Sequence, residues 1–486
     1  MPIDRRDFVK SLTASFAFSH VPAVTADKDA GRKSPNVIVM ICDDLGYGDL
    51  GCYGSKLPTP HLDAMAAQGA RFAHFNAAHP VCSASRAALL TGRYGHRMNT
   101  MGAFGPGSPI GTSLDETLLS NLFRKAGYST MAIGKWHLGD KPEYLPTNRG
   151  FDAFYGVPYS DDYYPLPLIR DLTALDKDTD RDLLTPRYTE EAVKFIETRR
   201  GKPFFLYLAF SYPHDPARAS ARFRGKTRFG DVGDCIAEID WSVGEIMHAV
   251  ERQGLTSDTL ICFTSDHGPW YQGSPGALRG RKGSSFEGGT RVPFLAKWPG
   301  RIPAGTVEHG WHSNLDLLPA LTTLCGLAAP NKPLDGVDMS ASLGGKTSKP
   351  KPKSRLYFCA MGNRGLDLHC IRKEEWKLRV AQGVEGDINI SDRTTAAKSS
   401  KWLRHAELYN LVDDPEESYD VAKLHPEVVA ELTKDMEALM PSFPPDVVAA
   451  YTTLNQRKGD ISTPPGASPR PLVPNPSWSW EPEDRR

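Results

Sequence analysis

A single cysteine in a loop of small residues is the strongest chemical signal in this 486-residue chain. Cys82 lies four residues before Arg86, and residues 87–93 continue as a helix-like run. A thiol in such a position can act as a nucleophile, as a metal ligand or as a substrate for oxidation. The loop by itself leaves these three roles open.

Two pairs of adjacent polar residues suggest a site for a divalent cation. Asp43 and Asp44 follow one apolar run, and Asp266 and His267 follow another, each before glycine. Neighbouring carboxylates repel each other unless a cation or a turn disperses their charge, and for one pair alone an Asx-turn would be the simpler interpretation. Together the pairs indicate oxygen ligands for Ca²⁺ or Mg²⁺, while the nitrogen of His267 leaves room for a softer metal.

Lys135 and His137 stand two residues apart at the end of a further apolar run. Extended geometry would direct both side chains to the same face. A fixed ammonium group lowers the affinity of a nearby histidine for protons, which favours a role as general base. A solvated loop anchored by Trp136 is the simpler alternative.

His214 and Lys282 carry weaker signals. His214 lies in a proline-flanked turn, and Lys282 lies in a glycine-flanked loop whose backbone could approach an anion closely. A turn residue and a solvated charge are the simpler interpretations of each. Taken together with the other motifs, they describe a pocket with a cation, a nucleophile and several positive charges. Such a pocket suits transfer of a sulfuryl or phosphoryl group.

The elements that must position these residues follow from apolar runs and helical patterns. Runs at 36–42, 129–134, 204–210 and 260–264 predict strands buried on both faces. Helical patterns at 59–69, 115–127 and 234–253 lie between them. The alternation predicts an α/β fold, a mostly parallel sheet flanked by helices, whose strand ends converge on one site.

The length of the chain predicts more than one folded unit. A Pro-, Lys- and Ser-rich linker at 346–353 precedes short strand-like pieces at 355–360, 368–372 and 376–380 and a helix at 426–439. These pieces predict a small antiparallel sheet packed by one helix. The expected organisation is a leader over 1–33, a catalytic domain over 34–350, a C-terminal subdomain over 351–456 and a Pro-rich tail over 457–486.

The amino terminus and the composition bear on location and partners. The twin-arginine form of 5–10, an apolar stretch at 12–24 and small residues at 24–26 predict an exported protein, with a charged disordered terminus as the alternative. The 58 basic and 58 acidic residues balance, so no net charge favours nucleic acid or an anionic membrane, and no later stretch has the length of a membrane span. Eight scattered cysteines do not form a disulfide framework, and we expect Cys42, Cys262 and Cys325 to be buried.

The motifs occur in the order found in type I sulfatases, and the chain resembles the arylsulfatase A-like members of the alkaline-phosphatase-like superfamily. The resemblance spans residues 35–440 and rests on the segments 36–48, 82–93, 134–139, 150–160, 265–268 and 282–289. It implies that Cys82 is converted to formylglycine. It also implies a Ca²⁺ site, with Mg²⁺ as an alternative, formed by Asp43, Asp44, Cys82, Asp266 and His267.

The resemblance further implies a mechanism. Hydrated formylglycine would attack sulfur, and Arg86 and Lys135 would neutralise the hydrate and the sulfate. His137 would deprotonate the second hydroxyl group, which expels sulfate. The remaining implied roles are substrate binding by Ser160, Lys135, His214 and Lys282, and protonation of the leaving alcohol by His214 and Lys282.

The resemblance therefore predicts an exported sulfatase that acts on sulfated carbohydrates or aryl sulfates and is activated by a formylglycine-generating or radical maturase. Ala84 and His267 depart from the common family pattern, which has proline and asparagine there. A phosphonate monoester or phosphodiester hydrolase of the same fold and a non-catalytic sulfoglycan-binding protein are the alternatives. We expect the insertions at 161–187 and 383–402 to shape specificity.

Overall fold

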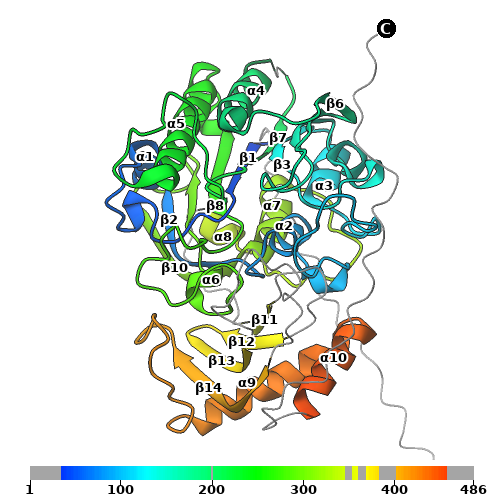
Figure 1. Ribbon diagram of the computed structural model, residues 1–486, viewed down its shortest axis with the longest axis vertical. Coiled ribbons are helices and arrows are strands. Elements are labelled where there is room, and N and C mark those ends of the chain that lie inside the picture. Colours follow the sequence, from blue (N-terminus) through cyan, green and yellow to red (C-terminus); the bar gives the residue numbers. More distant parts are fainter. Residues whose placement is uncertain (1–33, 199–200, 345–352, 360–367, 383–400, 457–486) are drawn as a thin grey trace, which may run out of the picture. The chain divides into compact units, whose positions relative to one another are not determined.

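The computed structural model describes residues 34–198, 201–344, 353–359, 368–382 and 401–456. Ten strands form one mixed sheet in the order β10-β2-β9-β8-β1-β7-β3-β4-β5-β6. Figure 1 labels β1, β3, β7 and β8 among its central strands. The five central strands are parallel: β8 (Thr259–Ser265), β1 (Asn36–Cys42), β7 (Phe204–Ala209), β3 (Ser129–Lys135) and β4 (Ala153–Val157). The predicted mostly parallel sheet is confirmed.

Shorter strands extend the sheet at both edges. On one side, β9 pairs antiparallel with β8 and β2, and β10 pairs parallel with β2. On the other side, β5 and β6 are antiparallel additions to β4. Their bounds are β2 (Ala70–Asn76), β9 (Phe294–Lys297), β10 (Thr306–Ser313), β5 (Leu168–Arg170) and β6 (Thr173–Asp176).

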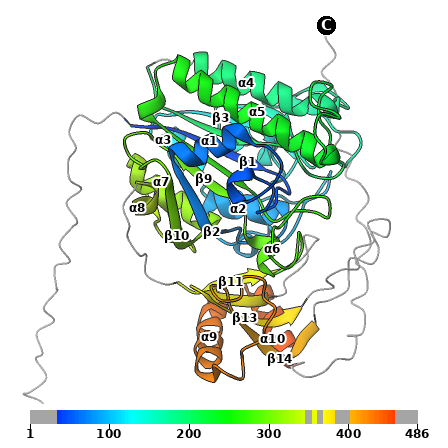
Figure 2. The same cartoon turned by 90° about the vertical axis from the view of Figure 1, so that its left-hand side faces the viewer.

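The alternation of side chains along β1 gives the sheet two buried faces. Residues 37, 39 and 41 belong to one apolar core, and residues 38, 40 and 42 belong to another. The first core includes α2 (Cys82–Thr91), α3 (Leu119–Lys125), α7 (Leu317–Cys325) and α8 (Ser340–Leu343). The second core includes α1 (Pro60–Gln68), α4 (Leu184–Thr198) and α5 (Gly230–Arg252). Figure 2 shows α4 and α5 side by side on their face of the sheet.

A separate four-stranded antiparallel sheet follows in the chain, as predicted. It contains β11 (Arg355–Phe358), β12 (Leu368–Lys373), β13 (Trp376–Gln382) and β14 (Lys401–Asn410). The predicted helix at 426–439 is confirmed as α9 (Pro426–Leu439). The expectation of a single helix is wrong, because α10 (Pro445–Gln456) contributes Val447 and Tyr451 to the same apolar core.

Short helices connect these elements. They are α6 (Glu287–Thr290) and the 3₁₀ turns η1 (Gly51–Tyr53), η2 (Gly95–Arg97), η3 (Pro142–Tyr144), η4 (Pro146–Arg149), η5 (Arg181–Leu183), η6 (Thr256–Asp258), η7 (Asn314–Asp316) and η8 (Met440–Ser442). The helix predicted at 115–127 begins only at Leu119.

Several predictions from the sequence fall on parts of the chain outside the described residues. These parts are the leader at 1–33, most of the linker, residues 383–400 of the second insertion and the tail at 457–486. The proposed domain boundaries therefore stay predictions. Within the described ranges, no helix combines the length and the apolar character needed to cross a membrane. All eight cysteines lie in these ranges, and none of them forms a disulfide; Cys42 and Cys262 are buried as expected, whereas Cys325 is only partly buried.

Candidate active site

The carboxyl ends of the central strands bring the predicted motifs together. β1 leads into Asp43 and Asp44, and the neighbouring β8 leads into Asp266 and His267. The two strand ends are connected by hydrogen bonds from the backbone N–H of Asp44 to Oδ1 of Asp266 (3.2 Å) and from that of Leu45 to Oγ of Ser265 (3.0 Å). The rule that ligands bind beyond the carboxyl ends of parallel strands thus applies to these carboxylates.

Helix α2 holds Cys82 against these strand ends. Cys82 is its first residue, and all ten residues of the helix are buried. Ser85 anchors the first turn, because its hydroxyl donates to the carbonyl oxygen of Asp266. Asn314 supports Ser85 by donating to its carbonyl oxygen (3.1 Å) and its hydroxyl oxygen (2.9 Å). The Sγ atom of Cys82 lies 3.2 Å from Nε2 of His267.

Arg86, one turn along α2, connects three of the strand ends. Its Nε donates to Oδ2 of Asp266 (3.0 Å), its Nη2 lies 3.3 Å from Oδ1 of Asp43, and its Nη1 donates to the carbonyl oxygen of Lys135 (3.1 Å). Burial disfavours the guanidinium charge, but Asp266 and Asp43 outweigh it and raise the pKa of Arg86. Arg86 therefore stays charged in a fully buried position.

Lys135 and its neighbours form the second wall of the site. The ammonium group of Lys135 contacts Oδ2 of Asp43 and donates to Oγ of Ser160 at 2.9 Å. Ser160 Oγ in turn lies 3.5 Å from Nε2 of His214. Although burial acts against ionisation, Lys135, His214 and Arg86 hold the pKa of Asp43 well below its usual value.

Lys282 lies at the more open side of the site. Its Nζ donates to both carboxylate oxygens of Asp44 at 2.9 Å. Burial still outweighs this cation and raises the pKa of Asp44 to about 6. The side chains of Lys282 and His214 are 9% and 11% exposed, whereas those of Asp43, Arg86 and Lys135 have no exposure. Lys282 and His214 are therefore the more exposed of these five side chains.

His137 is placed differently from the expectation. The strand ends at Lys135 and His137 has a φ of 59°, so the extended geometry predicted through both residues is wrong. Nε2 of His137 lies 2.8 Å from the carbonyl oxygen of Phe104 and donates to it, while Nδ1 is buried without a hydrogen-bond partner. Burial, followed by Lys135, lowers the pKa of His137 to about 3, as expected beside an ammonium group. The imidazole is therefore neutral with a free acceptor at Nδ1.

Four of the predicted metal ligands converge. Asp43, Asp44, Cys82 and His267 each offer a ligand atom, and these atoms all lie within 4.8 Å of one another. Nδ1 of His267 donates to the carbonyl oxygen of Gly268 (2.9 Å), which leaves Nε2 directed at the group. Asp266 lies beside them, with Oδ1 3.6 Å from Nε2 of His267.

This donor set fits a divalent cation. Burial opposes protonation of His267, yet Asp266, Cys82 and Asp44 raise its pKa to about 9, so the cluster attracts positive charge. Oδ1 of Asp43 is buried without a hydrogen-bond partner. Clustered carboxylate oxygens suit a hard cation such as Ca²⁺.

Tertiary contacts bring further residues to the site that none of the predicted motifs indicated. Asp161 lies with Oδ1 3.2 Å from Nδ1 of His214, and Asn314 supports α2. The adjacent pair Asp161 and Asp162 after Ser160 repeats the pattern of Asp43 and Asp44, and this repeat is a sequence signal for Asp161. Nothing in the sequence near Asn314 indicates a contact with Ser85, 229 residues away.

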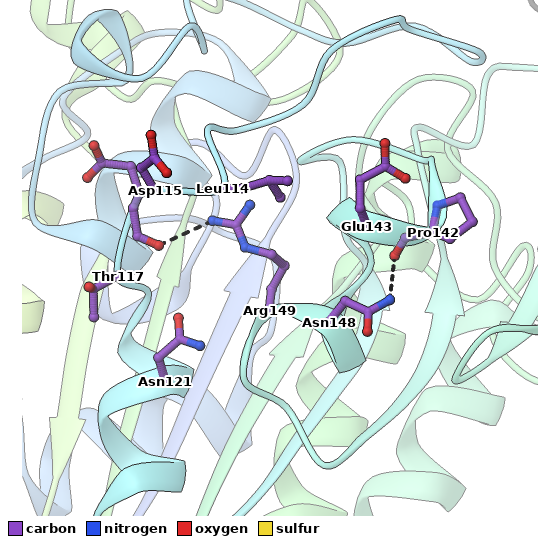
Figure 3. Close-up of a pocket in the computed structure, with 9 residues that line it drawn as sticks. Leu114, Asp115, Thr117, Asn121, Pro142, Glu143, Asn148 and Arg149 are labelled. Atoms are coloured by element: carbon purple, nitrogen blue, oxygen red, sulfur yellow. Dashed lines mark hydrogen bonds between the residues drawn. The ribbon is translucent and has the colours of Figure 1, made fainter.

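A hollow of about 680 Å³ at the start of α3 is separate from this site (Figure 3). None of the predicted site residues lines it. Arg149 occupies one wall and donates to the carbonyl oxygens of Thr112 (2.7 Å) and Ser113 (3.0 Å). Asn148 donates to the carbonyl oxygen of Pro142 (2.8 Å). These side chains hold loops in place, so the chemistry is assigned to the strand ends.

The fold and the site define the class of alkaline-phosphatase-like hydrolases, and comparisons with known proteins narrow it. The Sulfatase family model matches residues 35–327. Arylsulfatase A of Bos taurus is 36% identical over 489 residues, which cover 91% of this chain and 95% of that protein. N-acetylgalactosamine-6-sulfatase of Canis lupus familiaris is 39% identical over 352 residues, 65% of this chain and 67% of that protein. The chain belongs to the sulfatase family and is a type I sulfatase, a sulfuric ester hydrolase.

Solved structures agree with this assignment. A Bacteroides thetaiotaomicron sulfatase described in work on the metabolism of multiple glycosaminoglycans has 27% identity and a TM-score of 0.75, covering 84% of this chain and 99% of its own. A phosphonate monoester hydrolase of Agrobacterium radiobacter has 20% identity and a TM-score of 0.61, covering 84% of this chain and 96% of its own. The second likeness shows the fold alone.

Proposed function

We propose that this protein is an exported sulfatase that hydrolyses sulfate esters, principally of carbohydrates, through a covalent intermediate on formylglycine at position 82. The observation that carries the proposal is the position of Cys82. It begins a buried helix and faces Asp43, Asp44 and His267 with Arg86 one turn away. A side chain held there meets both a cation site and fixed positive charges.

The first step of the proposed reaction transfers the sulfuryl group to residue 82. The hydrated aldehyde would supply the nucleophile: as one of its hydroxyl groups gives its proton to water, a new S–O bond would form and the ester S–O bond would break. The electron pair of the broken bond stays on the leaving oxygen, which takes a proton from His214 or Lys282. The exposure of these two side chains supports this assignment, because the leaving group lies toward the opening.

The second step releases sulfate. His137 takes the proton of the remaining hydroxyl, the aldehyde C=O forms, and the C–O bond to the sulfate group breaks. Water then restores the hydrate. Hydrogen bonding of His137 to Phe104 supports this role, since it leaves Nδ1 as the acceptor. A thiol cannot follow this route, because it has no second hydroxyl group.

Fixed charges would stabilise the sulfate group in both steps. Arg86 and Lys135 are buried and charged, and Ser160 is oriented by Lys135. Asp43, Asp44, Asp266, His267 and the modified residue 82 would hold Ca²⁺, with Mg²⁺ as the alternative. The bound cation would supply positive charge against the oxygens of the sulfate group.

Carbohydrate is the preferred substrate class for two reasons. A relative acts, by its name, on an N-acetylgalactosamine 6-sulfate, and a structural neighbour belongs to glycosaminoglycan metabolism. The predicted twin-arginine leader would place the enzyme outside the cytoplasm, where sulfated polysaccharides occur. Activation requires a formylglycine-generating or radical maturase that accepts Ala84.

The first test is the mass of the tryptic peptide of residues 72–86 from protein coexpressed with a maturase. We expect the mass change for replacement of CH₂SH by CHO, and trapping of the aldehyde by a hydrazine. Modified protein should hydrolyse 4-nitrophenyl sulfate and release sulfate from sulfated oligosaccharides, with slower cleavage of phosphate mono- and diesters. Faster phosphodiester cleavage by the modified protein would overturn the proposal.

A further inference from the structure

His214 is contacted at both ring nitrogens by two consecutive residues. Nε2 lies 3.5 Å from Oγ of Ser160, and Nδ1 lies 3.2 Å from Oδ1 of Asp161. These residues follow strand β4, whereas His214 follows β7, so the sheet positions the two segments independently. The ring is therefore fixed with one nitrogen at the substrate side and the other at a carboxyl group.

Asp161 has a buried carboxyl group that lies beside the imidazole of His214. The residue has no exposure, and neither of its side-chain oxygens has a hydrogen-bond partner among the described residues. An ionised carboxylate in such a place is costly unless a cation faces it. Burial raises the pKa of Asp161 well above its usual value, and burial together with Lys282 lowers the pKa of His214 well below its usual value. A protonated carboxyl group beside a neutral imidazole therefore suits this place, and the pair holds one proton that it can pass on.

The backbone around the pair is fixed by Arg181. Its Nε donates to the carbonyl oxygen of Asp161 (2.9 Å) and its Nη2 to that of Tyr163 (2.8 Å). The hydroxyl group of Tyr212, two residues before His214, donates to the carbonyl oxygen of Arg181 (2.9 Å). One buried residue therefore connects the segment of Asp161 with the segment of His214. Such a connection keeps the distance between the two side chains short.

A second cation is the other occupant to consider, because Asp43, Asp161 and His214 offer ligand atoms within 4.8 Å of one another. The ammonium group of Lys135 already contacts Asp43 and lies 2.9 Å from Ser160 Oγ. A metal ion there would stand beside a fixed positive charge, which opposes its binding. The geometry favours a carboxyl–imidazole pair.

We propose that Asp161 is a positioning residue that orients His214 as the proton donor to the leaving alcohol. The inference rests on the proposed function. Nδ1 of His214 lies 3.2 Å from Oδ1 of Asp161, so the ring proton is carried on Nε2, toward the ester. When the S–O bond breaks, the leaving oxygen keeps the electron pair and takes the Nε2 proton, while the carboxyl proton of Asp161 passes to Nδ1; His214 stays neutral and Asp161 becomes a carboxylate.

The test compares leaving groups in the modified enzyme and in Asp161→Asn. An amide has no carboxyl proton to pass to Nδ1 and can hold the wrong tautomer of His214. We expect a loss in kcat/KM of about 100-fold for phenyl sulfate and for a sugar sulfate, whose leaving groups need a proton. For nitro-substituted aryl sulfates, which leave without one, the loss should be several times smaller. An equal loss for all leaving groups would overturn the proposal.

A double-mutant cycle with His214→Ala gives a second readout. If Asp161 acts through His214, Asp161→Asn should add nothing to the loss caused by His214→Ala. Additive losses would contradict the proposal. Asp162→Asn makes the same change one residue away and should keep the wild-type dependence on leaving groups. Aldehyde content and melting temperature show whether each variant is modified and folded.

The proposed function and the proposed role of Asp161 are refuted by different results. A modified wild-type enzyme that cleaves no sulfate ester would refute the proposed function. A wild-type enzyme that cleaves sulfate esters, together with an Asp161→Asn variant whose losses ignore the leaving group, would refute only the role of Asp161.

Discussion

Two buried clusters of charged residues in this molecule contain similar ion pairs but have different roles. The site cluster lies at the strand ends and consists of Asp43, Asp44, Asp266, Arg86, Lys135, Lys282 and His267. The inter-sheet cluster joins the segment around α6 to the small antiparallel sheet and consists of Glu287, Arg291, Arg372, Lys377 and Glu417. In both clusters acids and bases are almost completely buried.

The clusters differ in what stands between their carboxylates. In the inter-sheet cluster, Nζ of Lys377 lies 3.1 Å from Glu287 and 3.0 Å from Glu417, so an ammonium group separates the two acids. In the site cluster, Lys282 lies on the outer side of Asp44, and the ligand atoms of Asp43, Asp44, Cys82 and His267 face one another. The first arrangement pairs both acids with the protein's own cation, whereas the second directs the ligand atoms of four residues at one another, as a cation site would. A cluster of buried charged residues indicates a functional site when the protein's own cations do not separate its carboxylates from one another.

Replacing Cys82 should separate the roles of the two clusters most strongly. The variant Cys82→Ala cannot form the aldehyde, and we expect kcat for sulfate esters to fall by at least about 10⁴-fold. The melting temperature should stay within about 2 °C of wild type, because no ion pair is removed. Initial rates on 4-nitrophenyl sulfate and a thermal melt measure both effects. Retained turnover would contradict the assignment of the nucleophile.

Lys377→Met should have the opposite effect. It leaves Glu287 and Glu417 buried without their shared cation, and we expect the unfolding free energy to fall by about 3–5 kcal/mol. The folded enzyme should keep its kcat. Urea denaturation and rates below the transition measure the two quantities.

Lys373→Met is the matched control for this variant. Lys373 pairs with Glu431 (2.7 Å) and Asp435 (3.1 Å) on a partly exposed surface. Its loss should change the unfolding free energy by less than about 1 kcal/mol. Equal effects of Lys377→Met and Lys373→Met would remove the distinction between the buried cluster and a surface pair.

Removal of divalent cations should affect the site cluster alone. Chelation should abolish activity, and Ca²⁺ at 100 times its Kd should restore it and stabilise the fold by about 2.7 kcal/mol. Asp44→Asn should lose most of this stabilisation, because one ligand carboxylate is gone. Thermal melts with and without Ca²⁺ measure the increment. Lys377→Met should keep the full increment; a reduced increment in that variant would show that the clusters are linked.

A smaller, pH-dependent effect is expected from His369 in β12. Burial, with Arg379, lowers its pKa to about 3, whereas the unfolded chain has a histidine pKa of about 6.5. Below about 6.5 the unfolded state therefore binds a proton that the folded state refuses, and stability falls as pH drops toward 3. This residue should cost about 2 kcal/mol between pH 7 and pH 5. His369→Gln should show a correspondingly weaker acid sensitivity in denaturation measured at both pH values.

The central strands could be predicted because they are buried on both faces. Continuous apolar runs at 36–42 and 260–264 correspond to β1 and β8 within one residue. The edge strands could not be predicted, because β6 is only four residues long and β10 alternates between partly buried and exposed positions. Helix α10 carries a weak apolar pattern, and its packing against the small sheet is what fixes it.

The residues of the candidate site could be predicted where they lie directly at the end of a strand. Asp43 and Lys135 lie at such strand ends and could be predicted, whereas the left-handed backbone conformation of His137 could not. The partners of these residues come from distant segments: Asn314 reaches α2, and Asp161 reaches His214. Pairing across so many residues depends on how the sheet is assembled, which local patterns do not encode.

The complete burial of helix α2 also sets an order of events. Cys82 is 2% exposed, and all ten residues of its helix are buried. Under the proposed formylglycine mechanism, a maturase would have to reach this thiol before the fold buries it. Maturation would then be a step of biosynthesis that precedes the closure of the core. A chain that folded before it met its maturase would stay inactive, although stable, and the yield of active enzyme would depend on the speed of folding.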